Sequence, residues 1–424
     1  MNRSSFLLRG PAFTCVAALL TSATLASAQT VIDWSSTAST TSWTTDANWV
    51  GGSAPANDIT TNIARFNQTS YVSQPYNSTT AGRSIAGVII GDGSTATATL
   101  TMAGQGTGDL TIGANGVSML ANAGTATIGS FSAGGLVLAA NQTWTNNSSN
   151  TLDAMRVMSG GFSLEKSGSG VLILSRANTF SGGFTLTQGT VRVADPTSFG
   201  TGTVNLNAGV VSTSGASSRT IGNTISVGGN VQLGDTGFSG IVTYSGTVTV
   251  NGDRTITLAN NGAALTGAVV LNGNLTLSST IAFSGSGNTI TAAITDGAGT
   301  YGITKTGTGL IKLNGVNTFD GDVSIQQGTL SINTASIGDA ATVFLVTGAK
   351  LDLAFAGLDT IGGLSFDGVA QGEGTYGAIG SGADFQSSFF TGTGMLNVVP
   401  EPTSLALLGC GMLTVLVFRR RSRV

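Results

Sequence analysis

The sequence predicts an all-β protein folded as a right-handed parallel β-helix, or β-solenoid, and three observations lead to this fold class. Leu164–Val193 and Ile303–Ile332, each of about thirty residues, align without a gap, and such internal repeats are typical of stacked architectures. Glycine supplies 63 of 424 residues and charged residues only 9%, which favours short strands and tight turns. Polar and apolar residues alternate within both segments, as in strands with one buried face. Right-handed crossovers dominate among parallel strands.

The two segments together indicate which side chains face inward. Ile173 aligns with Lys312, so this position tolerates solvent while the residues on either side face the core. The positions predicted inside are Leu172, Leu174, Phe184, Leu186, Val191 and Val193, matched by Ile311, Leu313, Val323, Ile325, Leu330 and Ile332. Those predicted outside include Thr185, Thr187 and Arg192, matched by Ser324, Gln326 and Ser331. Strands this short are stable only when stacked rung upon rung.

Two short motifs separate these strands in both segments. They are Asn-Thr-Phe-x-Gly and Gln-Gly-Thr, in which Gly and Asn accept the positive φ of a tight bend. Phe180 and Phe319 occupy matched positions at the first bend, where we expect each ring to fill a corner of the solenoid.

The full pattern begins at Lys166 and Lys305 with Lys-x-Gly-x-Gly and then continues through three strands and both bends. It resembles the autotransporter-associated β-strand repeat, a family of exported bacterial proteins associated with right-handed β-helices. The resemblance covers residues 164–193 and 303–332, implies architecture and export, and transfers no catalytic residue.

Residues 1–28 have the features of a helical secretory signal. Arg3 and Arg9 give a positive start, Ala12–Leu20 is a short apolar core, and Ala26-Ser27-Ala28 matches an A-x-A cleavage site. We expect cleavage after Ala28, so that Gln29 becomes the first residue of the exported protein.

Residues 29–80 carry three of the four tryptophans, Trp34, Trp43 and Trp49. Exposed tryptophans could stack on sugar rings. The favoured interpretation is a Trp-rich cap, because the open end of a solenoid must be covered.

Residues 81–398 form the predicted β-helix body, with roughly 15 rungs of short strands. Within it we expect Asn141–Asn150 to be a polar loop and Asp352 and Asp359 to be turn residues. Both cysteines, Cys15 and Cys410, lie outside the body, so stacking must stabilise it without disulfides. Residues 29–399 together hold 11 basic and 19 acidic residues, a net charge of −8, which argues against nucleic acid as a partner.

Residues 399–424 form the second distinctive segment. Pro400, Glu401 and Pro402 precede an apolar run, Thr403–Phe418, and the basic residues Arg419, Arg420, Arg421 and Arg423 follow it. This order resembles a PEP-CTERM sorting signal. The resemblance implies transient anchoring of a helical segment in the inner membrane of a Gram-negative bacterium, processing by an exosortase-type enzyme, and delivery to the cell surface or extracellular matrix. A permanent tail anchor is the alternative.

The sequence offers little chemistry. It contains no histidine, the commonest general base and metal ligand. Asp320 and Asp322 are the best carboxylate pair, but the first copy has Ser181 and Gly183 there, which favours a solvated turn over a Ca²⁺ or catalytic site. We therefore predict no catalytic, metal or cofactor residues.

Two classes of function remain. One is a non-catalytic surface or matrix protein with an adhesive, biofilm or structural role, for which polysaccharide or matrix components are the expected partners. The other is an exported β-helix polysaccharide lyase or hydrolase, since parallel β-helices include such enzymes.

Overall fold

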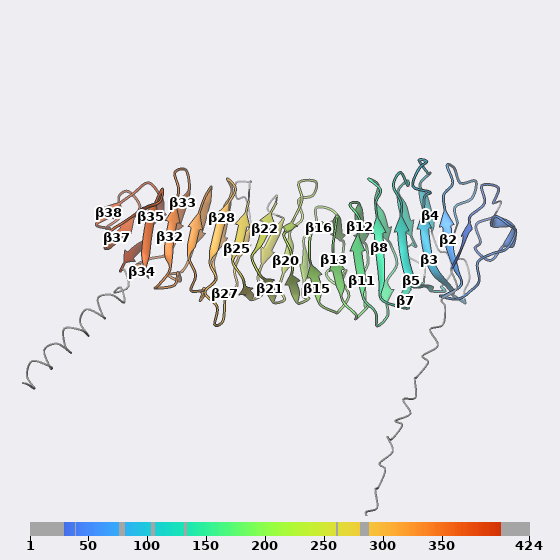
Figure 1. Ribbon diagram of the computed structural model, residues 1–424, viewed down its shortest axis with the longest axis horizontal. Coiled ribbons are helices and arrows are strands. Elements are labelled where there is room, and N and C mark those ends of the chain that lie inside the picture. The colour runs from blue at the N-terminus through green and yellow to red at the C-terminus, as the bar shows by residue number, and fades with distance from the viewer. Residues whose placement is uncertain are drawn as a thin grey trace, which may run out of the picture.

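The computed structural model describes residues 29–38, 40–75, 81–102, 107–130, 134–259, 262–279 and 288–399. These residues form an elongated rod of stacked strands (Figure 1), which confirms the predicted all-β parallel β-helix. The expected helical signal and apolar tail lie outside the described residues. Within the described part of the chain, no helix is long and apolar enough to cross a membrane, and η1 (Asp46–Asn48) is a single 3-10 turn.

The first sheet has 14 strands and runs from the N-terminal end to β27. Its strands are β1 (Thr30–Asp33), β2 (Asn62–Phe66), β3 (Arg83–Ile90), β5 (Leu110–Met119), β7 (Leu136–Leu138), β8 (Gln142–Asn146), β10 (Met158–Ser159), β11 (Leu164–Ser167), β13 (Phe184–Leu186), β15 (Val204–Leu206), β18 (Ile225–Val227), β21 (Val248–Asn251), β24 (Val269–Asn272) and β27 (Ile294–Thr295). Strands β1 and β2 extend this sheet into residues 29–80.

The second sheet also has 14 strands. They are β4 (Leu100–Met102), β6 (Ala126–Ile128), β9 (Leu152–Ala154), β12 (Val171–Leu174), β14 (Thr190–Val193), β16 (Val210–Thr213), β19 (Val231–Leu233), β22 (Arg254–Leu258), β25 (Leu275–Ser278), β28 (Ile303–Thr306), β30 (Val323–Ile325), β32 (Thr342–Leu345), β35 (Gly363–Phe366) and β36 (Val369–Ala370).

A third and a fourth sheet complete the rod. The third comprises β17 (Arg219–Ile221), β20 (Val242–Tyr244), β23 (Ala263–Leu265), β26 (Thr289–Ile290), β29 (Leu310–Leu313), β31 (Thr329–Ile332), β33 (Lys350–Leu353) and β39 (Phe390–Gly392). The fourth comprises β34 (Leu358–Ile361), β40 (Met395–Val398), β37 (Gly374–Gly377) and β38 (Phe385–Gln386). The pairings are parallel except near the C-terminal end, where β35–β36 and β37–β40 are antiparallel.

Each repeat spans more than one turn of the solenoid. In the first copy, β11 pairs with β13 in the first sheet and β12 pairs with β14 in the second. In the second copy, β28 pairs with β30 in the second sheet and β29 pairs with β31 in the third. The same local pattern therefore occupies a different pair of sheets in each copy.

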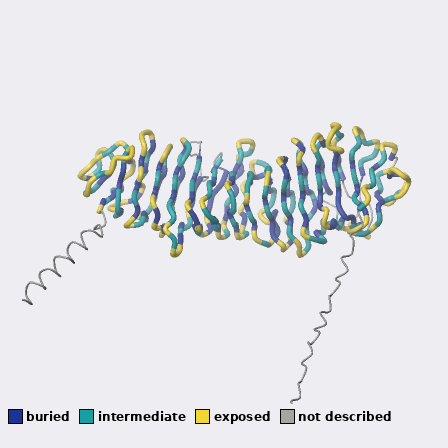
Figure 2. Tube along the Cα trace, viewed as in Figure 1, coloured by how far each residue is buried: buried dark blue, intermediate teal, exposed yellow. Residues whose placement is uncertain are grey.

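The predicted core of both repeats is confirmed, and buried positions alternate along the strands (Figure 2). All twelve positions expected inside are at most 2% exposed, and Phe180 and Phe319 are 0% and 1% exposed. Ser331 is an exception among the outward positions, because it is only 1% exposed. Its hydroxyl donates to Asp352 Oδ2 at 2.7 Å, so a neighbouring rung covers this part of the outer face.

The three N-terminal tryptophans are 1–2% exposed, which rules out the interpretation that they form an exposed platform for sugars. Trp34, Trp43 and Trp49 pack around Phe66 with ring centroids between 5.1 and 5.9 Å apart. Trp49 also donates its indole N–H to the Trp43 carbonyl at 2.9 Å. They fill the interior at the N-terminal end of the rod, as a cap would require.

Two local predictions are wrong. Asn141–Asn150 is not simply a loop, because it contains β8, whose Trp144 is fully buried. Asp352 and Asp359 lie within strands β33 and β34 and not in turns. The polar residues around Trp144 obscure the alternation of polar and apolar residues that predicts a strand. Asp352 and Asp359 do the same in β33 and β34.

Candidate functional site

The described residues contain no group of three or more His, Cys, Asp or Glu side chains that could hold a metal ion. Buried polar groups and surface depressions are the other candidate features of these residues. Four features stand out: two buried lysines, two bridging asparagines, one charged cluster on the outer face, and an acidic region near the second repeat.

Lys166 and Lys305 are both fully buried, although lysine is normally solvated. Lys166 Nζ donates to the carbonyls of Ser167 and Gly168 at 2.7 Å and of Gln188 at 3.1 Å. Lys305 makes the same three bonds, to Thr306, Gly307 and Gln327, at 2.7, 2.7 and 3.1 Å. Burial lowers the pKa of each lysine to about 8. The ammonium ties the glycine bend of one rung to the Gln-Gly-Thr bend of the next.

Asn178 and Asn317 act as side-chain substitutes for backbone pairing. Asn178 accepts from the Met158 N–H at 2.8 Å and donates to the Ser198 carbonyl at 2.6 Å. Asn317 accepts from the Ile294 N–H at 3.1 Å and donates to the Ser336 hydroxyl at 3.2 Å. Each amide bridges the rung below and the rung above at the first bend of its repeat.

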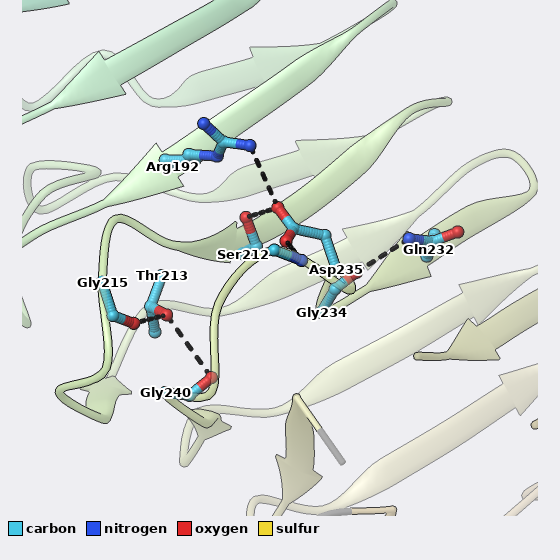
Figure 3. Close-up of polar contacts among 9 residues, drawn as sticks. Arg192, Ser212, Thr213, Gly215, Gln232, Gly234, Asp235 and Gly240 are labelled. Atoms are coloured by element: carbon cyan, nitrogen blue, oxygen red, sulfur yellow. Dashed lines mark hydrogen bonds and ion pairs between the residues drawn. The ribbon is translucent and has the colours of Figure 1, made fainter. Parts of the chain in front are cut away.

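A charged cluster lies on the outer face of the second sheet (Figure 3). Asp235, which follows β19, accepts from Arg192 at 3.4 Å and from the Ser212 hydroxyl at 2.8 Å. The Arg192 guanidinium carbon also lies 4.5 Å from the centre of the Phe238 ring. These contacts hold the segment after β19 against β14 and β16, so we assign the cluster a stabilising role.

Asp320 and Asp322 lie beside two surface depressions, but they do not act as a pair. The Asp320 N–H donates to Asp296 Oδ2 at 3.1 Å, whereas Asp322 Oδ1 accepts from the Thr342 N–H at 2.8 Å. Depressions of about 480 and about 650 Å³ adjoin this bend. Asp320 lines both, and Asp322 lines only the smaller one.

Asp359 is an acidic residue whose environment could not be seen in the sequence. It lies on β34, is only 6% exposed, and lines the larger depression together with Asp339. Its Oδ2 accepts from the N–H groups of Ser336 and Ile337, both at 3.0 Å. Burial raises the pKa of Asp359, and the nearby Asp339 adds to this rise. The available signal is its spacing of two residues from Ile361, which places both side chains on the same, largely buried face of β34.

Most residues predicted to direct export lie outside the described residues, namely Ala26, Ala28, Pro400, Glu401, Pro402, Arg419, Arg420 and Arg421. Gln29 is described and stands directly before β1. At the other end, the Val399 N–H donates to the Ile361 carbonyl at 3.0 Å, so hydrogen bonding to the body extends to the residue before Pro400.

Comparison with known families finds two matches on the segments already described. Residues 164–193 and 303–332 match the passenger-associated-transport-repeat, and residues 398–421 match the PEP-CTERM protein-sorting motif. The chain is thus a β-solenoid protein that carries two such repeats and a PEP-CTERM sorting motif.

A stretch of 143 residues, 32% of this chain, is 37% identical to the adhesin BmaC autotransporter of Brucella suis biovar 1 (strain 1330). The match covers only 4% of that protein. No solved structure matches the chain.

Proposed function

We propose that this chain is an exported, non-catalytic β-helix protein of the cell surface or extracellular matrix of a Gram-negative bacterium, with an adhesive, biofilm or structural role. The observation that carries the proposal is the sorting motif, which begins at residue 398, within the last strand of a rod built on passenger-associated-transport repeats. The adhesin name of the similar Brucella protein supports the adhesive role. The buried Lys166 and Lys305 fit a structural use, because their amines are engaged with backbone carbonyls.

Deletion of the gene tests this proposal. We expect the deletion strain to lose surface labelling by antibodies against the rod and to attach less well to a surface. Complementation with the full chain should restore both properties. Normal attachment in the deletion strain, with the rod shown to be absent, would contradict the adhesive role.

An exported polysaccharide lyase or hydrolase is the second candidate function, and the carboxylates around the two depressions are the observation that favours it. Incubating the purified protein with bacterial and plant polysaccharides, with and without Ca²⁺, separates the two functions. Release of reducing ends or of unsaturated products would favour the enzyme, whereas intact polysaccharide would favour the surface protein.

We further propose that an exosortase-type enzyme removes the tail near Pro402 after a transient stage in the inner membrane. Two prolines in three positions keep this segment extended, which suits a peptide that must enter a protease cleft. Peptide mapping of the mature C-terminus tests this step. Recovery of intact protein through Val424 at the cell surface would instead indicate a permanent anchor.

A further inference from the structure

Thr300, Asp320 and Ala340 line both depressions near the second repeat. The two depressions are therefore adjacent, and we refer to them together as the acidic groove. The groove lies beside the point where the first sheet ends at β27. Beyond β27 the chain still stacks here, as shown by the bond from the Thr318 N–H to the Ile294 carbonyl at 2.9 Å. In this part of the rod the chain forms bends in place of a regular strand. The groove is therefore bordered by the residues of these bends.

Asp359 is an anchored carboxylate that faces this groove. Its Oδ2 is held by two backbone N–H groups, while Oδ1 accepts no hydrogen bond from the described residues. The side chain is more than nine-tenths buried yet lines the larger depression, so its remaining accessible surface faces that space. Oδ1 is not a fully buried oxygen, so it is open to water or to a donor group of a ligand in the larger depression.

The charge of the groove restricts the ligand. Asp320, Asp322, Asp339 and Asp359 line it, and among the described residues no lysine or arginine does. A polyanion such as a polyuronate would be repelled, whereas a ligand with ammonium groups would be attracted.

The outer surface of the second sheet adds an aromatic contact. Phe344 is 39% exposed and lines the smaller depression. It stands in register with Ser324, which in turn pairs with Thr304, and both polar residues line the same depression. An aromatic ring beside hydroxyl and carboxylate groups can pack on the apolar face of a sugar and attracts a nearby cation.

We propose that this groove binds a polysaccharide whose sugar units carry unsubstituted amino groups. Phe344 packs against a sugar ring, and Asp359 and Asp320 accept hydrogen bonds from an ammonium group and hydroxyls. This names the matrix partner of the surface role proposed above and rests on that role.

Calorimetric titration of the purified full chain with oligosaccharides of equal length tests the proposal. The probes are oligomers of glucosamine, N-acetylglucosamine and galacturonic acid. We expect the glucosamine oligomer to bind at least tenfold more tightly than the other two, and its affinity to fall with added salt. Equal binding of the acetylated oligomer, or tighter binding of the galacturonic acid oligomer, would overturn the proposal.

Two variants with matched controls locate the site. Asp359→Asn keeps an oxygen for the Ser336 and Ile337 N–H groups and should weaken glucosamine-oligomer binding at least fivefold, whereas Asp195→Asn in the first half of the rod should not. Phe344→Thr should also weaken binding, whereas Phe162→Thr, at a similarly exposed ring (42%), should not. Unchanged affinity in both groove variants would contradict the assigned site.

Failure of the groove assignment can be distinguished from failure of the proposed surface role. If no glucosamine oligomer binds while the deletion strain still loses attachment, the groove assignment falls and the surface role stands. If the oligomer binds but is cleaved during titration, the groove is confirmed as a site while the non-catalytic role falls.

Discussion

The two repeat copies make the same contacts in different places on the rod. Lys166 and Lys305 hold equivalent carbonyls at identical distances, yet the first copy lies on the first and second sheets and the second copy on the second and third. Both copies step by the same number of residues from one rung to the next, as the pairs Leu164–Phe184 and Ile303–Val323 show. The repeat therefore encodes a local step between rungs and does not encode a particular face.

The copies differ at the first bend. The first copy has Ser181-Gly182-Gly183, and Gly183 has a φ of 91°, a conformation that glycine adopts without strain. The second copy has Asp320-Gly321-Asp322 at the edge of the acidic groove. The shared residues should thus matter for stability in both copies, and the differing residues should matter mainly for the surface.

The largest expected effect comes from the shared aromatic corner. Phe180→Ala and Phe319→Ala should each lower the free energy of unfolding by roughly 3–5 kcal/mol, because both rings are fully buried and the change leaves a cavity. Denaturant unfolding of the two variants measures this. A small effect in one copy only would show that the copies are not equivalent.

The shared lysine should have the next largest effect. Lys166→Met and Lys305→Met each leave three backbone carbonyls without their donor and should cost about 1–3 kcal/mol at neutral pH. The wild type should also become more stable as the pH rises from about 8 toward 10. The folded pKa of about 8 lies below the ordinary value of 10.5, so the unfolded chain binds more protons across this window.

The double variant Lys166→Met/Lys305→Met is the control for the pH dependence. Its free energy of unfolding should no longer rise between pH 8 and 10. The same rise in both proteins would mean that other groups cause it.

The bridging asparagines should contribute differently to stability in the two copies, because their hydrogen bonds differ in length. Asn178 makes bonds of 2.8 and 2.6 Å, and Asn317 makes bonds of 3.1 and 3.2 Å. We expect Asn178→Ala to cost about 1–2 kcal/mol and Asn317→Ala to cost less. Thermal unfolding of the two variants checks the order, and a larger cost for Asn317→Ala would contradict it.

The smallest expected effect on stability belongs to the differing bend. Asp320→Ser together with Asp322→Gly gives the second copy the bend of the first, and should change the free energy of unfolding by less than about 1 kcal/mol. The same variant should bind the glucosamine oligomer more weakly. A large loss of stability would mean that the acidic bend is part of the structural framework.

Much of the fold could be predicted because two copies of one repeat were available for comparison. Aligned polar and apolar residues, such as Lys312 opposite Ile173, identified the outer face, and the alternation then placed Leu172 and Leu174 inside. Single segments without a second copy allow no such test, so the polar residues of Asn141–Asn150 predict a loop where the structure has β8.

The site was harder to predict, since it depends on contacts between rungs. Ser331 is buried because Asp352 of the next rung covers it, and Asp359 is anchored by backbone groups more than twenty residues away in the sequence. One signal of the buried lysines is present in the sequence. Lysine occupies the same position in both copies, two residues after the inward-facing Leu164 or Ile303. The second copy lies on a different pair of sheets from the first, and this difference depends on how many strands make up each turn of the solenoid. The sequence of the repeats alone does not contain that number.

Engineered disulfides test the equivalence of the two copies most directly, because the two native cysteines, Cys15 and Cys410, lie outside residues 29–399. Glu165 and Thr185 are register partners on the outer face of the first copy, and Thr304 and Ser324 are the matching partners in the second. With each pair replaced by cysteines, neighbouring parallel strands place the two Cα atoms within disulfide range. We predict rapid, complete bond formation under mild oxidation in both copies. Formation in only one copy, or in neither, would contradict a common step between rungs.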